Sequence, residues 1–181
     1  MFLSLIQKRR SIRKYQDRSV ESEKVDLLVE AALRPPSSKG NRPWEFVVVT
    51  DRGLLEGLAR AKVHGSAFLK DAPLGIVVCA RPEKSDVWVE DAAIASTFLL
   101  LTAESLGLGA CWIQIRERMH SEGRSSQAYI ADLLGLPQGM TVQSIIAVGY
   151  PDESKAPRGK DELAYERVHL NGYGRPYDRP R

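Results

Sequence analysis

A basic cluster occupies residues 9–15, where the sequence reads RRSIRKY. A guanidinium group offers a planar set of donors that matches a phosphate, and Ser11 adds a hydroxyl group. A solvated basic helix end explains the same residues, because cations interact favourably with the C-terminal end of a helix dipole. The cluster therefore predicts either an anion site or a charged helix terminus, and this stretch alone favours neither.

A second candidate segment is PPSSKGNRPW, residues 35–44. Its serine hydroxyls and backbone N–H groups suit the polar edge of a ring, and the indole of Trp44 suits an apolar wall. An ordinary loop between a helix and a strand explains the same proline, serine and glycine content. The composition thus permits a ligand loop without requiring one.

A third candidate segment is APRGKDE, residues 156–162. In an extended chain, residues i and i+2 face the same way, so Arg158 and Lys160 can reach one phosphate together. Taken alone, the segment is more typical of a solvated tail.

The elements that must position these segments alternate irregularly between helices and strands. Besides a helix running into Arg9 and one between its N-cap Ser22 and Pro35, we expect helices over 51–62, 86–105 and 127–136. We expect strands over 45–51, 74–80, 109–115 and 142–151. The helix 86–105 is apolar on nearly every face, which predicts burial on all sides, in the core or against another subunit. This order indicates one domain of class α+β or α/β with three layers, followed by an extended arm over 152–181.

The glycines in GLGACW, residues 107–112, give only the first half of a dinucleotide-binding fingerprint. That fingerprint needs a strand running into a helix, and here a helix runs into a strand. Gly107 and Gly109 are therefore predicted to end the preceding helix.

Composition excludes several classes of protein. The chain has 181 residues, 43% hydrophobic and 27% charged, with a formal net charge of +3, which is typical of one globular domain. Cys79 and Cys111 lie in apolar surroundings, as expected for buried thiols in a reducing compartment. The three histidines are too scattered for a metal site. Without a secretory pattern or a long apolar run, we expect a cytoplasmic protein that does not enter a membrane.

The order of five stretches resembles the FMN-dependent nitroreductase family along essentially the whole chain. These stretches are RRSIRKY, PPSSKGNRPWEFVVV, DAAIASTFLLLTAESLGLGACWI, IIAVGYP and the basic C-terminal segment. The resemblance implies an α+β fold, a three-layer α/β/α sandwich with a central mixed, mainly antiparallel sheet. It also implies a homodimer with two FMN molecules, each bound at the subunit interface, and a C-terminal extension onto the partner subunit.

The resemblance assigns residues to the flavin one by one. Arg9 matches the N-terminal arginine on the FMN phosphate, Arg10 and Ser11 follow along the phosphate and ribityl chain, and Arg13 matches the basic residue near the pyrimidine edge. Arg158 and Lys160 match the paired C-terminal cations on the phosphate. Pro36, Ser37 and Ser38 match the loop that each subunit contributes to the flavin site of its partner. Ile113 and Gln114 match the segment that lies along the flavin ring. Arg42 replaces a common amide and can donate to the carbonyl edge of the ring, while Lys39 and Trp44 are assigned to the rim of the substrate pocket.

The implied reaction is a ping-pong oxidoreduction in which NADH or NADPH reduces FMN and an acceptor then reoxidises it. The protein supplies binding, orientation and electrostatics, so no catalytic acid, base or nucleophile is assigned. Nitroaromatics, quinones and related acceptors all fit. Two alternatives remain: a flavoenzyme of the same fold that dehalogenates a substrate or fragments flavin, and a flavin-free basic module that binds RNA or another anionic partner.

Overall fold

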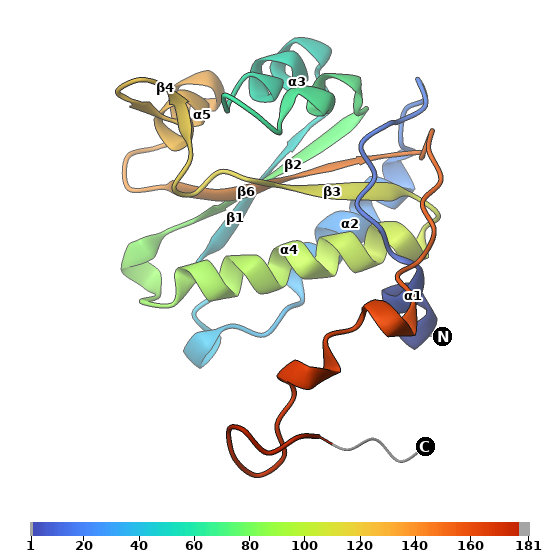
Figure 1. The fold of residues 1–181 in the computed structure, drawn as a ribbon. Helices are drawn as coiled ribbons and strands as arrows, with labels where there is room; N and C mark the ends of the chain where they lie inside the picture. Colours follow the sequence, from blue (N-terminus) through green and yellow to red (C-terminus); the bar gives the residue numbers. More distant parts are fainter. Residues whose placement is uncertain (1, 178–181) are drawn as a thin grey trace.

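The computed structural model describes residues 2–177 and is built around one four-stranded sheet (Figure 1). The strand order is β1-β2-β6-β3, and every neighbouring pair is antiparallel. The strands are β1 Trp44–Val49, β2 Leu74–Ala80, β3 Gly109–Gln114 and β6 Thr141–Gly149. The predicted bounds of β2 are confirmed, and β6 ends at Gly149, the glycine predicted to end that strand. Strands β1 and β3 end two residues and one residue earlier than predicted, and β1 and β6 each begin one residue earlier.

Helices cover both faces of the sheet and make the predicted three layers. The helices are α1 Phe2–Lys8, α2 Ser22–Leu33, α3 Arg52–Ala59, α4 Trp88–Ser105 and α5 Ser126–Leu134. Because the two central strands are buried on both faces, adjacent residues enter different cores: Ile145 joins the core under α3 and α5, and Ile146 joins the core under α2 and α4.

The ends of the helices follow local rules with one correction. Ser22 is the first residue of α2 rather than its N-cap, which is Glu21. Gly107 adopts a φ of +72°, and the N–H of Leu108 reaches back 2.9 Å to the carbonyl of Ala103, which completes a glycine-terminated helix end. This confirms that Gly107 ends α4 and does not begin a dinucleotide fold.

Helix α4 is buried on one face only within the single chain, so its predicted burial on all sides stays a prediction that requires another subunit. The side chains that pack into the core are Ala92, Ala95, Ser96, Leu99 and Ala103. The opposite face leaves Ile94 38% exposed and Phe98 36% exposed. The apolar sequence of this helix is therefore only half explained by the fold of one chain.

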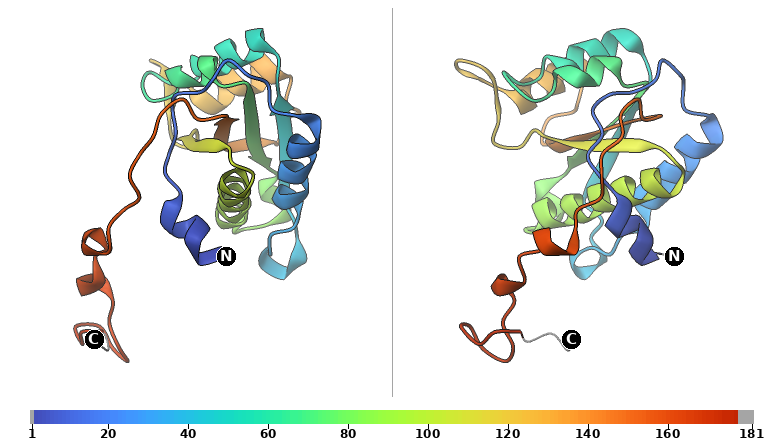
Figure 2. Two further views of the ribbon diagram at one scale, coloured as in Figure 1. Left: turned by 90° about the vertical axis from the view of Figure 1, so that its right-hand side faces the viewer. Right: turned by 45° about the vertical axis from the view of Figure 1, so that its right-hand side comes forward.

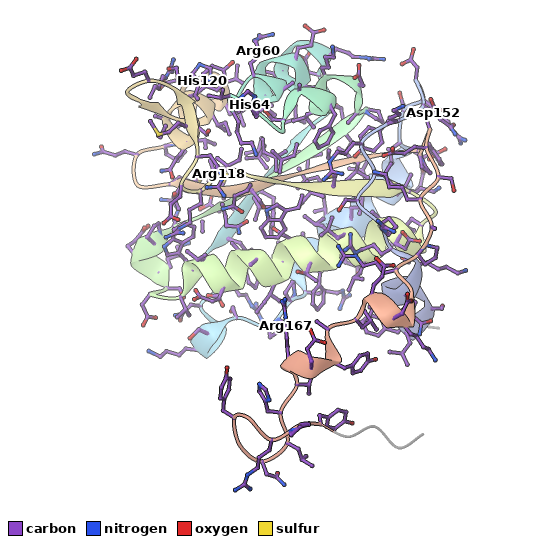
Figure 3. The ribbon with its side chains drawn as sticks, viewed as in Figure 1. Arg60, His64, Arg118, His120, Asp152 and Arg167 are labelled. Atoms are coloured by element: carbon purple, nitrogen blue, oxygen red, sulfur yellow. The ribbon has the colours of Figure 1, made fainter. Side chains whose placement is uncertain are left out.

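A short hairpin between β3 and α5 was not expected from the sequence. It is formed by β4 Met119–Ser121 and β5 Arg124–Ser125 and packs beside the loop that follows α3. His120 of this hairpin and Arg60 after α3 are joined by a 2.8 Å hydrogen bond from Nδ1 to the Arg60 carbonyl (Figure 3). Strands of three and two residues leave almost no alternating pattern to detect.

The two basic ends of the chain lie side by side along the outer edge of β3. Ser11 forms an isolated parallel bridge with Ala110, which makes the otherwise antiparallel sheet mixed. On the other side of this segment, the N–H of Asp152 donates to the carbonyl of Lys14 across 2.9 Å. The chain then leaves the body of the molecule as an extended arm with two short turns of helix, Lys160–Glu162 and Tyr165–Arg167 (Figures 1 and 2).

Residues 2–177 contain no helix long and apolar enough to cross a membrane. The same residues contain no cluster of three or more histidine, cysteine or acidic side chains suited to a metal ion. Both cysteines are buried and free, as predicted.

Candidate functional site

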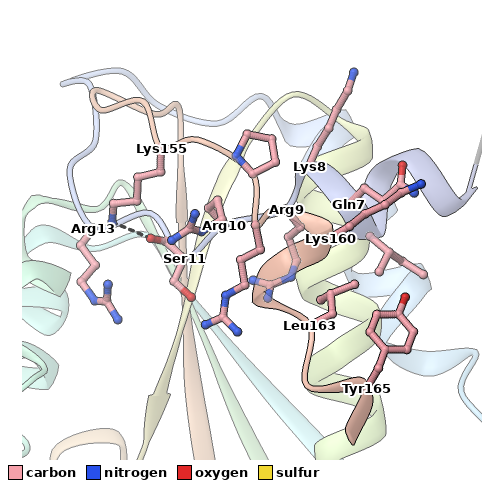
Figure 4. Close-up of a pocket in the computed structure, with 13 residues that line it drawn as sticks. Gln7, Lys8, Arg9, Arg10, Ser11, Arg13, Lys155, Lys160, Leu163 and Tyr165 are labelled. Carbon is pink, nitrogen blue, oxygen red and sulfur yellow. Dashed lines mark hydrogen bonds between the residues drawn. The ribbon is translucent and has the colours of Figure 1, made fainter. Parts of the chain in front are cut away.

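A cavity of about 880 Å³ lies between α1, the segment 9–13 and the C-terminal arm (Figure 4). The structure brings to this one cavity six of the residues predicted from the sequence: Arg9, Arg10, Ser11, Arg13, Arg158 and Lys160. Lys8 and Lys155 also line it, so the wall contains seven cationic side chains and, among the described residues, no acidic one. Such a wall has a strongly positive potential and suits a phosphate group.

Most of this charge is not neutralised within the chain. Over residues 2–177, Arg9, Arg158 and Lys160 make no ion pair with a carboxylate. Lys155 is the exception, since its Nζ lies 2.9 Å from the Glu153 carboxylate. Like charges held together without counter-charges repel each other, and an anionic ligand relieves that repulsion.

The basic N-terminal segment is held in place by its own backbone and by Ile12. The side chain of Ile12 is 8% exposed and turns into the core, while Ser11 and Arg13, the residues on either side of it, line the cavity. Ile12 fits only because residue 109 is glycine: a Cβ there would lie 2.7 Å from Ile12 Cγ2. The close approach of the two backbones thus orients side chains that line the cavity.

Lys155 and Glu153 connect this segment to the start of the arm. Lys155 Nζ donates to the carbonyl of Ser11 across 2.8 Å, and Glu153 Oε1 accepts the N–H of Arg13 across 2.6 Å. The Arg13 N–H, followed by Lys155, lowers the pKa of Glu153 below its ordinary value. Sequence reasoning missed Lys155, although it stands only three residues before Arg158 in the same basic segment.

Arg10 has a different environment from Arg9. Its Nη1 donates to the carbonyl of Ala156, so this guanidinium fastens the arm to the body. Arg10 also lines a second hollow of about 210 Å³ together with Lys8 and Glu104. The predicted contact of Arg10 with a ligand stays a prediction, while its contact with the arm is a feature of the single chain.

The serine loop lies apart from this cavity, near the other end of α4 (Figure 1). None of the predicted residues in this loop and at its edge lines the cavity: Pro36, Ser37, Ser38, Lys39, Arg42 and Trp44. The resemblance assigned the serines to the flavin site of the partner subunit. Their distance from the basic cavity of their own chain leaves that assignment a prediction. Trp44, assigned to a substrate rim, is only 5% exposed at the start of β1.

Asp91 anchors the serine loop, and the apolar pattern of the helix around it did not indicate this role. The carboxylate is 2% exposed and accepts the N–H of Ser38 and the hydroxyl of Ser85, each across 2.9 Å. Lys39 and Arg42 have φ values of +53° and +46°, a region that side chains other than glycine rarely adopt. Such strain is common in loops that bind ligands.

The two residues predicted to lie along a flavin ring sit at the end of β3. Ile113 is fully buried, and the Gln114 side chain is held at both ends. Its Oε1 accepts from Trp112 Nε1, and its Nε2 donates to the carbonyl of Arg116, each across 3.0 Å. Neither residue lines the cavity of the single chain.

Comparison with known proteins agrees with this geometry. The model of the Nitroreductase family matches residues 6–150. A protein from Methanothermobacter thermautotrophicus named "Putative NADH dehydrogenase/NAD(P)H nitroreductase" is 40% identical over 174 residues, covering 93% of this chain and 85% of the relative. A protein with the same name from Archaeoglobus fulgidus is 36% identical, covering 92% and 95%.

Solved structures give the same answer. An FMN-dependent nitroreductase from Clostridium difficile superposes with a TM-score of 0.93 at 47% identity, covering 94% of this chain and 99% of the other. These matches confirm the resemblance found in the sequence and the sandwich fold. The chain belongs to the Nitroreductase family.

Proposed function

We propose that this protein is an FMN-dependent NAD(P)H oxidoreductase that reduces nitroaromatic, quinone or related acceptors. The observation that carries the proposal is the convergence of Arg9, Arg158 and Lys160, from opposite ends of the chain, on one cavity without an acidic residue in its wall. Relatives named NAD(P)H nitroreductase and FMN-dependent nitroreductase support the choice of cofactor and donor.

The residues present fit a flavin mononucleotide by their chemistry. A phosphate monoester carries close to two negative charges and offers three acceptor oxygens, which matches three unpaired cations together with the Ser11 hydroxyl. In this proposal Arg9, Arg158 and Lys160 hold the phosphate, and Arg10 and Ser11 lie along the chain that follows it. FMN supplies two-electron hydride chemistry when bound.

At the ring end, this chain contributes charge and hydrogen-bond donors. Arg13 carries the positive charge assigned to the pyrimidine edge, and its guanidinium carbon lies 5.8 Å from the centre of the Phe68 ring. A fixed cation at that edge stabilises negative charge that develops on the ring. The backbone N–H of Gln114 is assigned to N5, and Ile113 to the adjacent surface.

The rest of the proposed site comes from a second copy of the chain. The loop with Pro36, Ser37, Ser38 and Arg42 lies away from the basic cavity, so it would serve the partner's flavin. We infer a homodimer in which the exposed face of α4, with Ile94 and Phe98, packs on the partner. The described residues 2–177 would then form one domain, with the arm from residue 152 crossing onto that partner. Residue 1 and residues 178–181, which the sequence also assigned to this domain and arm, lie outside the described residues.

A comparison of FMN with riboflavin tests the phosphate site. In the double variant Arg158→Gln/Lys160→Gln, we expect affinity for FMN to fall by roughly 10–100-fold, because two exposed charge-assisted hydrogen bonds are lost. Affinity for riboflavin, which lacks the phosphate, is expected to stay unchanged. Arg34→Gln is the matched control, since Arg34 directly follows α2 and pairs with Glu30. If the double variant lost affinity equally for FMN and riboflavin, or lost affinity for neither, the assignment of Arg158 and Lys160 to the phosphate would be contradicted.

The reaction itself is tested with the purified holoenzyme without oxygen. We expect NADH or NADPH to bleach the flavin absorbance, and a nitroaromatic or quinone to restore it. Turnover of a haloaromatic acceptor in place of these would favour the dehalogenating alternative. A protein that binds neither flavin would contradict the proposed function as a whole.

A further inference from the structure

Two short basic segments share one pattern and lie side by side. The pattern is Arg-x-Lys/Arg-x-His, at residues 60–64 after α3 and at residues 116–120 after β3. The N–H of Val63 donates to the carbonyl of Met119 across 3.4 Å, and His120 Nδ1 binds the carbonyl of Arg60 across 2.8 Å. Figure 3 places the labelled residues of both segments on the same side of the molecule. We call residues 60–64 and 116–120 the basic pair.

The basic pair carries charge that this chain does not neutralise. Arg116 is paired with Glu117 at 2.7 Å, but over residues 2–177 Arg60, Lys62 and Arg118 make no ion pair. Lys62 is partly buried, and its burial, followed by the nearby Arg118, lowers its pKa. Cations that repel each other in a partly dehydrated position are stabilised by an anion placed between them.

The basic pair adjoins the ring end of the proposed flavin site. Gln114, whose backbone N–H is assigned to N5, donates from its side-chain Nε2 to the carbonyl of Arg116 across 3.0 Å, so the second segment of the pair begins beside the ring end. Phe68, which lies beside the Arg13 guanidinium, follows the first segment of the pair by four residues. A molecule that reacts at the ring can therefore extend onto the basic pair.

We propose that the basic pair binds the phosphate-bearing half of the NAD(P)H donor. This inference rests on the proposed function and adds a subsite to it. Lys62 and Arg118 face the pyrophosphate, while Arg60 extends the positive surface around it. Val63 and Met119, which are 61% and 50% exposed, provide the apolar surface that suits the nucleoside. The flavin-binding cations are separate residues, so donor binding and flavin binding can be tested independently.

The test compares donors with and without phosphate on the FMN-loaded protein. In the double variant Lys62→Gln/Arg118→Gln, we expect KM for both NADH and NADPH to rise roughly tenfold, with kcat nearly unchanged, because two cations in the donor site are lost. The rate with 1-benzyl-1,4-dihydronicotinamide, a hydride donor without phosphate, is expected to equal that of the wild type. FMN content should also be unchanged, and the conservative variant Lys62→Arg/Arg118→Lys should restore KM. Arg34→Gln again serves as the control for an arginine elsewhere.

Each other outcome overturns the inference. Unchanged KM values for both dinucleotides would exclude the basic pair as a donor site, and an equal loss with the benzyl donor would indicate general damage to the flavin site. A further outcome is that the wild type binds labelled single-stranded DNA in a salt-dependent way and that the double variant loses this binding while its KM is unchanged. That result would identify the basic pair as a nucleic-acid surface. A wild-type holoenzyme reduced by the benzyl donor but not by NAD(P)H overturns the donor subsite alone. A wild-type holoenzyme that is reduced by neither NADH, NADPH nor the benzyl donor overturns the proposed function as well.

Discussion

The ammonium group of Lys155 donates a hydrogen bond to the backbone carbonyl of Ser11 across 2.8 Å, although 144 positions separate the two residues. This bond joins the start of the C-terminal arm to the basic N-terminal segment. Because Lys155 also pairs with Glu153, which accepts the N–H of Arg13, three contacts hold the two sides of the cavity together. The relative position of the proposed phosphate ligands depends on this junction.

Replacing Lys155 is therefore expected to affect both the fold and the flavin. For Lys155→Met we expect about 1 kcal/mol less stability, since a partly exposed hydrogen bond from a charged group is lost. FMN affinity should fall about tenfold, because one cation of the wall disappears. Urea unfolding and flavin fluorescence titration measure the two effects. Lys155→Arg should retain most of both, and Lys84→Met, at an exposed lysine elsewhere, should change neither.

Gly109 tests the close approach of the N-terminal segment to β3. In Gly109→Ala the new Cβ would lie 2.7 Å from Ile12 Cγ2 and 2.8 Å from Ile12 Cβ, and this branched side chain cannot move away freely. We expect a loss of about 1–3 kcal/mol in unfolding free energy from overpacking, with lower FMN occupancy. The double variant Gly109→Ala/Ile12→Ala should be less destabilised than the sum of the two single variants. Simple additivity in urea unfolding would contradict the contact.

Asp91 tests the anchoring of the serine loop. Asp91→Ala leaves the Ser38 N–H and the Ser85 hydroxyl without their acceptor, and we expect a loss of about 2–4 kcal/mol in thermal or urea unfolding. Limited proteolysis should cut the chain faster within residues 35–42. Asp91→Asn keeps one oxygen acceptor and should fall between the wild type and the alanine variant. An alanine variant as stable and as resistant to protease as the wild type would show that the loop holds its shape by other means.

Glu21 predicts an acid-sensitive step in stability. A hydrogen bond from the Tyr150 hydroxyl, supported by Arg18, lowers the pKa of Glu21 from 4.5 to about 2. Because the folded-state pKa is the lower one, this stabilisation is complete above the unfolded value and is lost as pH falls from about 5 to about 2. The difference in unfolding free energy between the wild type and Glu21→Gln should therefore shrink across that range. In Tyr150→Phe the folded-state pKa of Glu21 should be higher, so the loss should be smaller and should end at higher pH. A difference independent of pH would contradict the assignment.

Local signals in the sequence predicted much of the secondary structure. Leu74–Ala80 is a continuous apolar run bounded by proline at one end, and the strand has those bounds. Gly135, with a φ of +63°, ends α5 after Leu134, two residues before the predicted end of this helix at residue 136. The β4–β5 hairpin was missed because its strands have three and two residues, too few for an alternating pattern.

The types and order of the basic residues were determined by the sequence, since charge, donor geometry and helix termination act within a few positions of each residue. The tertiary structure decided which of those residues meet. It brought Arg9 to Arg158 and Lys160, used Arg10 to hold the arm, placed the serine loop at another part of the molecule and shaped that loop with Asp91. These relationships depend on sheet register and on the approach of Ile12 to Gly109, which join segments far apart in the chain, so no local rule could have predicted them.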